Sequence, residues 1–264
     1  MFRGFNVEIN SLHAINAREW YVAGLDLFKT QRNQIRQALG DLVLTNGSLS
    51  GAVLQQQWFP QVEADLFISH SHADAETAII LAGLLYKEFD IKSFTDTTVW
   101  GYGDELLQQL DNKHCLTGPQ RYNYEARNKS TSHVHMMLAG AISKMIDNTE
   151  CVFFLNSPAS VSASEVMDAT LSPWLYFEVL ATQLLRKKLP KEHPRRQVIT
   201  KSFSDDERLI NEALEISYPV ELGHLTPLVF SGGFLSRLRQ KAGRYTFKLD
   251  ALYTLCPQQN ILHS

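Results

Sequence analysis

The sequence predicts an α/β protein in which a parallel β-sheet is flanked by helices. Three short apolar runs end in polar residues, as strands buried in a parallel sheet do. The expected strands lie at residues 64–69, 91–96 and 150–155. Segments with apolar residues at helical spacing lie between and after them, at residues 75–89, 135–147 and 173–185. This alternation of strand and helix is typical of a sheet covered on both faces.

The remaining segments are expected to add helices and connectors around this core. Residues 11–39 read as one amphipathic helix that packs against the domain or against a dimer partner. Residues 97–133 are polar and rich in Asn, Gly and Tyr, which predicts a long loop. A fourth strand at 215–222 and a short helix at 234–242 are expected near the end.

Three regions follow from this division. Residues 1–60 are predicted to be an amino-terminal helical extension with a connector, residues 61–230 the α/β domain, and residues 231–264 a carboxy-terminal helical extension. The basic, proline-broken stretch 186–196 is interpreted as an exposed connector.

Composition excludes several classes of protein. The chain has 264 residues, of which 44% are hydrophobic and 20% charged, so a soluble globular protein is expected. The formal net charge of -3 argues against nucleic acid as the main partner. The cysteines Cys115, Cys151 and Cys256 form no Cys-x-x-Cys pair, which favours a reduced, cytoplasmic location without disulfides or zinc. No apolar stretch is long enough for a membrane span, and a signal peptide is not indicated.

The candidate site residues cluster at the predicted strand ends and on one helix. Ligands of open parallel sheets bind beyond the carboxyl ends of the strands. The polar residues expected there are Ser69, His70, Ser71, Asp96 and Ser157. Trp174 and Glu178 lie four residues apart in the helix that follows the third strand, so they share one face of it. A single pocket is therefore expected to gather these side chains.

Four segments, in this order, resemble the motifs of the Toll/interleukin-1 receptor (TIR) family. They are Phe67-Ile68-Ser69-His70, Phe94-Thr95-Asp96, Phe154-Leu155-Asn156-Ser157-Pro158, and Ser172-Pro173-Trp174 with Glu178. The resemblance covers about residues 63–185. His70 replaces the tyrosine that usually ends the first motif. The segment at 97–133, in the place of the family's BB loop, is much longer than in animal receptors and is similar to that of bacterial TIR proteins of antiviral defence, such as the NAD-using subunit of Thoeris-type systems.

The resemblance implies a flavodoxin-like fold and an NAD-consuming activity. In enzymatic members, a glutamate placed like Glu178 cleaves the bond between nicotinamide and ribose, giving ADP-ribose or a cyclic ADP-ribose signal. Trp174 would shield the pocket, and Trp100 would stack on a base or on nicotinamide. Contacts to the substrate are expected from Ser69, His70, Ser71, Asp96 and Ser157. For Ser71 and Asp96, the contacted group could be a phosphate or a ribose.

The same resemblance implies partners. NAD is expected as substrate, with no bound cofactor and no metal. Family members assemble through TIR–TIR contacts, so a homo-oligomer and a downstream effector protein are expected, whereas nucleic acid and membrane are not.

Other interpretations of these residues and of the function stay open. His70 and His72 could serve loop structure, and Asp96 could fix the loop that it begins. The His133–His135 pair lacks a third metal ligand at useful spacing. Two other functions compete with the enzyme: a non-catalytic TIR interaction module, and a sensor that binds NAD or a derivative without cleaving it. Thermal stabilisation by NAD without release of nicotinamide would favour the sensor.

Overall fold

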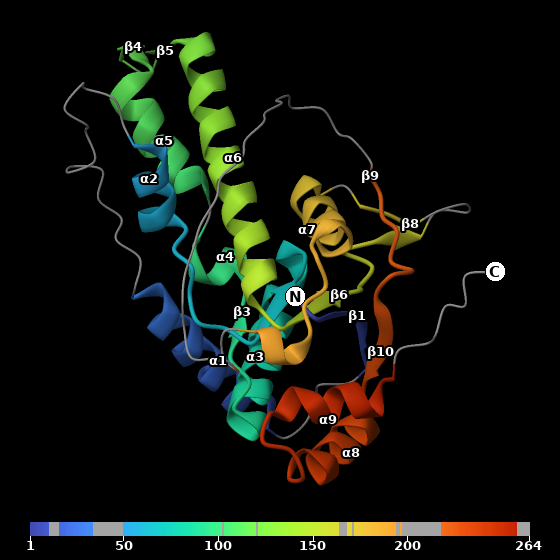
Figure 1. Cartoon of the computed structure of the whole chain (residues 1–264). Coiled ribbons are helices and arrows are strands. Elements are labelled where there is room, and N and C mark those ends of the chain that lie inside the picture. Colours follow the sequence, from blue (N-terminus) through green and yellow to red (C-terminus); the bar gives the residue numbers. More distant parts are fainter. Residues whose placement is uncertain are drawn as a thin grey trace.

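A parallel β-sheet forms the centre of the protein, here described from a computed structural model (Figure 1). The structure describes residues 1–10, 16–33, 50–101, 103–119, 121–163, 168–170, 172–193, 196 and 218–257. Within these residues the sheet has five strands in the order β10-β1-β6-β2-β3, and every pairing is parallel. The strands are β1 (Arg3–Ile9), β2 (Leu66–Ser69), β3 (Ser93–Phe94), β6 (Cys151–Leu155) and β10 (Thr226–Phe230).

The three strands predicted from apolar runs are confirmed as β2, β3 and β6. Every residue of each of these strands is buried. Because helices cover both faces of the sheet, the side chains on both faces are shielded from water, and the sequence of such a strand is mostly apolar.

β1 corrects the expectation that residues 1–60 form only a helical extension. It lies between β10 and β6, with Phe5 in register with Phe153. Its sequence alternates: Phe5 and Val7 are fully buried, whereas Asn6 is half-buried and Glu8 exposed. The order β3-β2-β6 is that of the first three places of a flavodoxin-like sheet, and β1, from the start of the chain, takes the fourth place.

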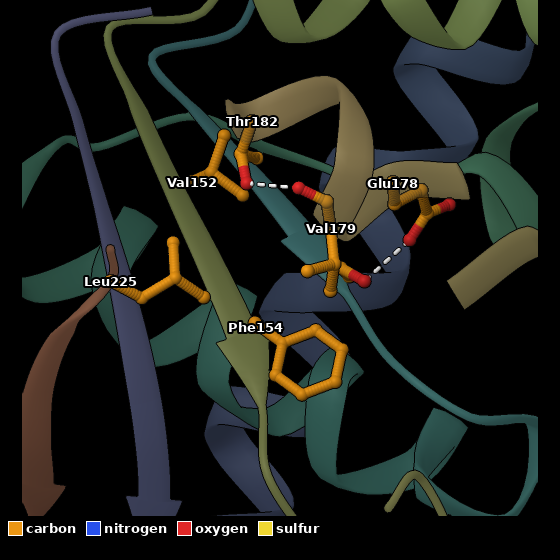
Figure 2. Close-up of a pocket in the computed structure, with 7 residues that line it drawn as sticks. Val152, Phe154, Glu178, Val179, Thr182 and Leu225 are labelled. Atoms are coloured by element: carbon orange, nitrogen blue, oxygen red, sulfur yellow. Dashed lines mark hydrogen bonds between the residues drawn. The ribbon is translucent and has the colours of Figure 1, made fainter. Parts of the chain in front are cut away.

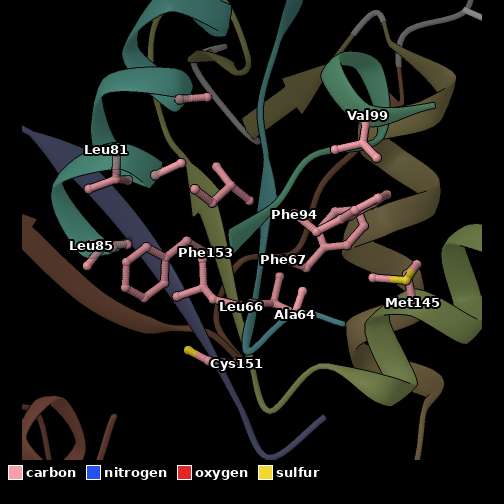
Figure 3. Close-up of a cluster of buried hydrophobic side chains, with 14 of the residues drawn as sticks. Ala64, Leu66, Phe67, Leu81, Leu85, Phe94, Val99, Met145, Cys151 and Phe153 are labelled. Carbon is pink, nitrogen blue, oxygen red and sulfur yellow. The ribbon is translucent and has the colours of Figure 1, made fainter. Parts of the chain in front are cut away.

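Helices cover both faces of the sheet (Figure 1). One face carries α6 (Tyr124–Asn148) and α7 (Pro173–Leu184), and the other carries α1 (Ala17–Arg32), α3 (Ala75–Phe89) and α8 (Gly232–Ala242). Figure 3 shows Leu81 and Leu85 of α3 beside Phe153, and Met145 of α6 on the other side, near Phe67 and Phe94. The apolar core therefore lies on both sides of the sheet.

α1 is part of the domain, because its backbone touches that of α3. A Cβ atom on Gly24 would lie 2.1 Å from the carbonyl oxygen of Ile79, and one on Gly83 would lie 1.7 Å from that of Trp20. Only glycine allows so close an approach at both positions. Of the two roles expected for the helix at 11–39, packing against the domain is confirmed for its described part.

The segment at 97–133 was expected to be a loop, and this expectation is wrong. It forms α4 (Asp96–Val99), α5 (Gly103–His114), the hairpin β4 (Leu116–Gly118) and β5 (Arg121–Tyr122), and the first turns of α6. α5 packs along α6, with Leu106 and Val134 buried. The two helices project beyond the sheet (Figure 1). Because most of their surface faces water, their sequence is polar enough to resemble a loop.

The carboxy-terminal expectations are confirmed in part. The helix expected at 234–242 is α8, which α9 (Lys248–Leu255) follows. Residues 215–217 of the expected fourth strand lie outside the described residues, as do 11–15 and 34–39 of the amino-terminal helix. The described remainder contains only β9 (Tyr218–Pro219), which pairs with β8 (Asp168–Thr170) outside the central sheet.

Smaller elements complete the described chain. They are α2 (Gly51–Trp58), β7 (Ser162–Ala163), and the 3-10 turns His72–Asp74 and Pro190–Glu192. Each helix of the described ranges is too short or too polar to pass through a lipid bilayer.

Candidate functional site

The carboxyl ends of β2 and β6 form the topological switch point of the sheet. From β2 the chain passes to β3 on one side, and it returns later to β6 on the other side. The two strands end in register, so the loops that follow them leave the sheet side by side. Ligands of doubly wound sheets bind in the crevice at such a point. Four predicted site residues belong to this place: Ser69, His70, Ser71 and Ser157.

α7 brings Glu178 to the same place. Ser172 caps the helix by accepting a hydrogen bond from the backbone N–H of Leu175 at 3.3 Å, and Pro173 occupies the first turn, where it is tolerated. The buried face of the helix carries Leu175, Glu178, Val179 and Thr182, at the spacing of one helical stripe. Glu178 is the only ionisable residue of that stripe, so the helix presses a carboxyl group against the sheet.

Glu178 is buried and receives a short hydrogen bond from the hydroxyl of Ser69. The two side chains are 3% and 1% exposed. Burial raises the pKa of Glu178 well above its usual value, and the nearby charge of Asp96 raises it further. The Ser69 hydrogen bond acts in the opposite direction, because it stabilises the ionised form. Two predicted site residues that are 109 positions apart in the sequence therefore meet.

Asp96 and His70 form a second layer beside Glu178. Burial raises the pKa of Asp96, and the charge of His70 partly offsets this effect. Burial likewise lowers the pKa of His70, against the charge of Asp96. The His70 ring contacts the Ile68 carbonyl through Nδ1 at 3.4 Å and the Thr97 hydroxyl through Nε2 at 3.2 Å. A carbonyl only accepts, so Nδ1 carries the proton and Nε2 accepts from Thr97.

Ser71 and Ser157 meet at a residue that sequence reasoning missed, Asp74. Each hydroxyl donates to Oδ2 of Asp74 at 2.6 Å. Asp74 therefore ties the loop after β2 to the loop after β6. The signal in the sequence was an aspartate at the start of a helix, which is common enough to be passed over as a cap.

A small, mostly apolar pocket adjoins Glu178 between α7 and the sheet (Figure 2). It is lined by Ser69, Val152, Phe154, Glu178, Val179, Thr182 and Leu225. The empty space among these side chains, about 180 Å3 with open solvent included, has no room for a water-sized molecule, so the side chains pack closely around the carboxyl group.

Trp100 does not lie in this site, which corrects its expected role. It is 2% exposed, and its ring packs edge-on against Phe94 with 4.7 Å between centroids. Its Nε1 donates to the carbonyl of Pro60 at 3.0 Å. Every face of the indole is therefore occupied by the core, and stacking on a base or on nicotinamide would require its removal from there.

Trp174 is partly packed against the protein and partly exposed to solvent. It is half-buried, and its ring meets that of His135 on α6 edge-on, with 5.4 Å between centroids. It sits one turn before Glu178 on α7. This contact attaches the first turn of α7 to α6, on the side of the helix that leads towards the site.

Other reactive side chains do not form a second centre in the described ranges. No three His, Cys, Asp or Glu side chains gather there as metal ligands would. The three cysteines are free thiols, and burial raises the pKa of each of them. Reactive cysteines have a lowered pKa, so these thiols are in the unreactive form.

Comparison of the chain with protein-family models, with curated proteins and with solved structures found no match. The geometry of the site and the motifs of the sequence are therefore the basis for the function proposed below.

Proposed function

We propose that this protein is a TIR-type enzyme that consumes NAD by cleaving the bond between nicotinamide and ribose. The observation that carries the proposal is Glu178, a buried carboxyl group at the switch point whose pKa is raised and whose described hydrogen-bond partner is Ser69. Strongly perturbed carboxyl groups in such places are typical of catalytic sites, although ion-pair networks also perturb them.

Cleavage of the bond between nicotinamide and ribose requires only one carboxylate. Nicotinamide leaves NAD as a neutral base, so no acid has to protonate it. The transition state is a ribosyl oxocarbenium ion, as in glycoside hydrolysis, and an adjacent carboxylate stabilises its positive charge. Glu178 takes this role and holds the ribose hydroxyls. Capture of the ribosyl cation by water gives ADP-ribose, and capture by an atom of the same molecule gives a cyclic product.

The charge of the substrate suits the electrostatics of the site. A cation placed beside a carboxyl group lowers its pKa and favours the ionised form. The nicotinamide ring of NAD is such a cation, so its arrival would ionise Glu178 at the time when the carboxylate is needed. Before that, burial and the charge of Asp96 favour the neutral acid.

The closed pocket requires an opening step. The pocket has no room for a water-sized molecule and is therefore too small for NAD. We propose that assembly of several copies, or contact with a partner, displaces α7 or the neighbouring loops and admits the substrate. The protein would then be a cytoplasmic enzyme of bacterial antiviral defence that is inactive at rest and signals to an effector protein.

A non-catalytic interaction module is the second candidate, and one observation favours it. The tip of the α5–α6 projection exposes apolar side chains: Tyr124 is 73% exposed, Leu116 46% and Tyr122 38%. Such residues at a projecting tip suit contact with another protein. In this reading the hydrogen bond between Ser69 and Glu178 only holds α7 against the sheet.

The test is chromatography of NAD incubated with concentrated protein, beside the variant Glu178→Gln. Release of nicotinamide by the wild type alone is the expected result, and the co-product separates hydrolase from cyclase. Equal loss of NAD in both samples would remove Glu178 from the catalytic role. Absence of cleavage together with thermal stabilisation by NAD would favour the sensor. Self-association without any effect of NAD would favour the interaction module.

A further inference from the structure

Asp74 connects the two loops at the switch point without acting as the cap of its own helix. It occupies the N-cap position of α3, yet its side chain accepts no hydrogen bond from that helix. Instead, Oδ2 accepts one hydrogen bond from Ser71 and one from Ser157, each at 2.6 Å. The carboxylate thus gives up the usual role of an N-cap aspartate and fixes the rotamers of both hydroxyl groups.

Ser71, Asp74 and Ser157 together form an edge of the site, and the number of their hydroxyl protons determines which groups this edge can bind. A serine hydroxyl has one proton to donate, and both protons here go to Asp74. The Ser157 oxygen already accepts from the N–H groups of Ala159 and Ser160, at 3.1 and 3.2 Å. Among the described residues, no donor is directed at the Ser71 oxygen. Ser71 therefore offers lone pairs beside a carboxylate, and no proton.

This surface is open, in contrast to Glu178. Ser71, Asp74 and Ser157 are half-buried, whereas Glu178 is 3% exposed. A ligand that approaches from this side meets three side chains that present only acceptors before it reaches the proposed catalytic carboxyl group. Hydroxyl and amide N–H groups can donate to such an edge. A phosphate group, which is anionic and needs donors, is repelled by it.

We propose that Asp74 is a positioning residue that turns Ser71 and Ser157 into acceptors, so that this edge selects the ribose hydroxyls of the substrate and excludes its phosphates. The inference rests on the proposed function, because it assigns part of NAD to this edge. It also decides between phosphate and ribose for Ser71, which the sequence left open.

The substitution Asp74→Asn tests the proposal, because an amide is neutral and carries a donor beside its acceptor oxygen. The amide oxygen can still accept from both hydroxyls in place of Oδ2, but without the negative charge the two hydrogen bonds are weaker and the hydroxyls are freer to donate to a ligand. Binding is measured by calorimetry in the Glu178→Gln background, where no turnover occurs. NAD is expected to bind about tenfold more weakly, the effect of losing one charge-assisted hydrogen bond. Inorganic phosphate is expected to compete with NAD in the Asp74→Asn protein and not in the Glu178→Gln protein alone.

Two further variants keep the test decisive. Glu76→Gln removes the same charge from an exposed position in the same helical turn, and it should change neither NAD binding nor phosphate competition. Ser71→Ala, a small change at a half-buried loop position, serves if Asp74→Asn does not fold. It should weaken NAD binding about threefold to tenfold without admitting phosphate.

The outcomes separate this inference from the proposed function. Unchanged NAD affinity in Asp74→Asn, or in Ser71→Ala if that variant replaces it, overturns the inference even if the wild type cleaves NAD. So does weaker NAD binding in Asp74→Asn without phosphate competition, because a purely structural role predicts that result. Binding with the expected pattern but no cleavage by the wild type overturns the enzyme and keeps the edge. If the Glu178→Gln protein does not bind NAD, the inference fails, and the proposed function fails with it only if the wild type does not cleave NAD.

Discussion

Two buried glutamates lie at opposite ends of the same sheet, and their surroundings differ. Glu150, just before β6, is 7% exposed and accepts hydrogen bonds from Nε and a terminal nitrogen of Arg196 at 2.8 and 2.7 Å, and from the Tyr253 hydroxyl at 3.0 Å. Glu178, beyond the other end, is 3% exposed and is held by Ser69, with the like charge of Asp96 nearby.

The difference is the one expected between a structural carboxylate and the catalytic carboxylate proposed above. At the amino end, a cation and a hydroxyl compensate for the loss of water around Glu150. At the carboxyl end, the raised pKa of Glu178 records a cost that the fold does not remove. A side chain kept at such a cost is the kind on which catalysis depends. The predictions below test each end of this comparison.

The largest effect is expected from Arg196→Ala at the amino end. Arg196 binds Glu150 and also Asp250, at 2.9 Å. Its removal leaves the buried charge of Glu150 without a cation, which costs about 3–5 kcal/mol of unfolding free energy. Urea denaturation measures the loss. A change below about 1 kcal/mol, as for exposed pairs, would mean that the two ends differ less than their contacts indicate.

Acid should destabilise the amino end through His193. The imidazole is 1% exposed, and burial lowers its pKa to about 4. The unfolded state therefore binds a proton at higher pH than the folded state. The stability that comes from keeping His193 neutral is complete above about pH 6.5 and is lost as the pH falls. At pH 4 the loss of unfolding free energy is about 3 kcal/mol. Denaturation at pH 7 and 4.5 should show the loss, and His193→Leu should reduce it.

Ser69→Ala should weaken the carboxyl end in a pH-dependent way. Loss of the hydroxyl leaves a buried carboxyl group without its described donor, which costs about 1–3 kcal/mol. Because Ser69 favours the ionised form of Glu178, the pKa of Glu178 should rise further and the loss should be greater at pH 8 than at pH 5. Equal losses at both pH values would show that Ser69 does not act through the charge of Glu178.

Tyr253→Phe should give the smallest change, because Arg196 remains on Glu150. It removes one hydrogen bond of 3.0 Å, and about 1 kcal/mol is expected. Unlike that of Ser69→Ala, this effect should be similar at pH 6 and 8. A loss as large as that of Arg196→Ala would indicate that Tyr253 and Arg196 act as one unit, which the double variant would reveal.

The elements that could be predicted from the sequence are those with a single strong pattern of apolar residues. β6 is apolar throughout and β2 is apolar up to Ser69, whereas a helix with one apolar stripe also carries polar residues at regular intervals. β1 was missed although Phe5 and Val7 alternate with polar or small residues, because Gly4 and Asn6 weaken the apolar signal. A Cβ atom on Gly4 would lie 2.5 Å from the end of the Leu225 side chain, which would then have to shift. That constraint belongs to the packing and is invisible in the local sequence.

The site residues could likewise be predicted only where a local sequence pattern fixes their position. The meeting of Ser69 with Glu178 was predictable, because strand ends and helical spacing fix both positions. Trp100 was misplaced because an aromatic residue in a polar segment suggests a ligand contact, whereas the segment folds back and buries the indole on Phe94. Asp74 was missed because its partners come from two loops, and one of them is 83 residues away.

The most direct test of the comparison is the unfolding free energy of Glu178→Gln against the wild type at pH 5 and pH 8. Glutamine keeps an acceptor for Ser69 and cannot ionise. Since the pKa of Glu178 is raised in the folded state, the stability of the wild type is reduced as the pH rises. The account predicts a variant that is more stable than the wild type, by a larger margin at pH 8. A variant that is less stable by the same amount at both pH values would contradict it and give Glu178 the structural role of Glu150.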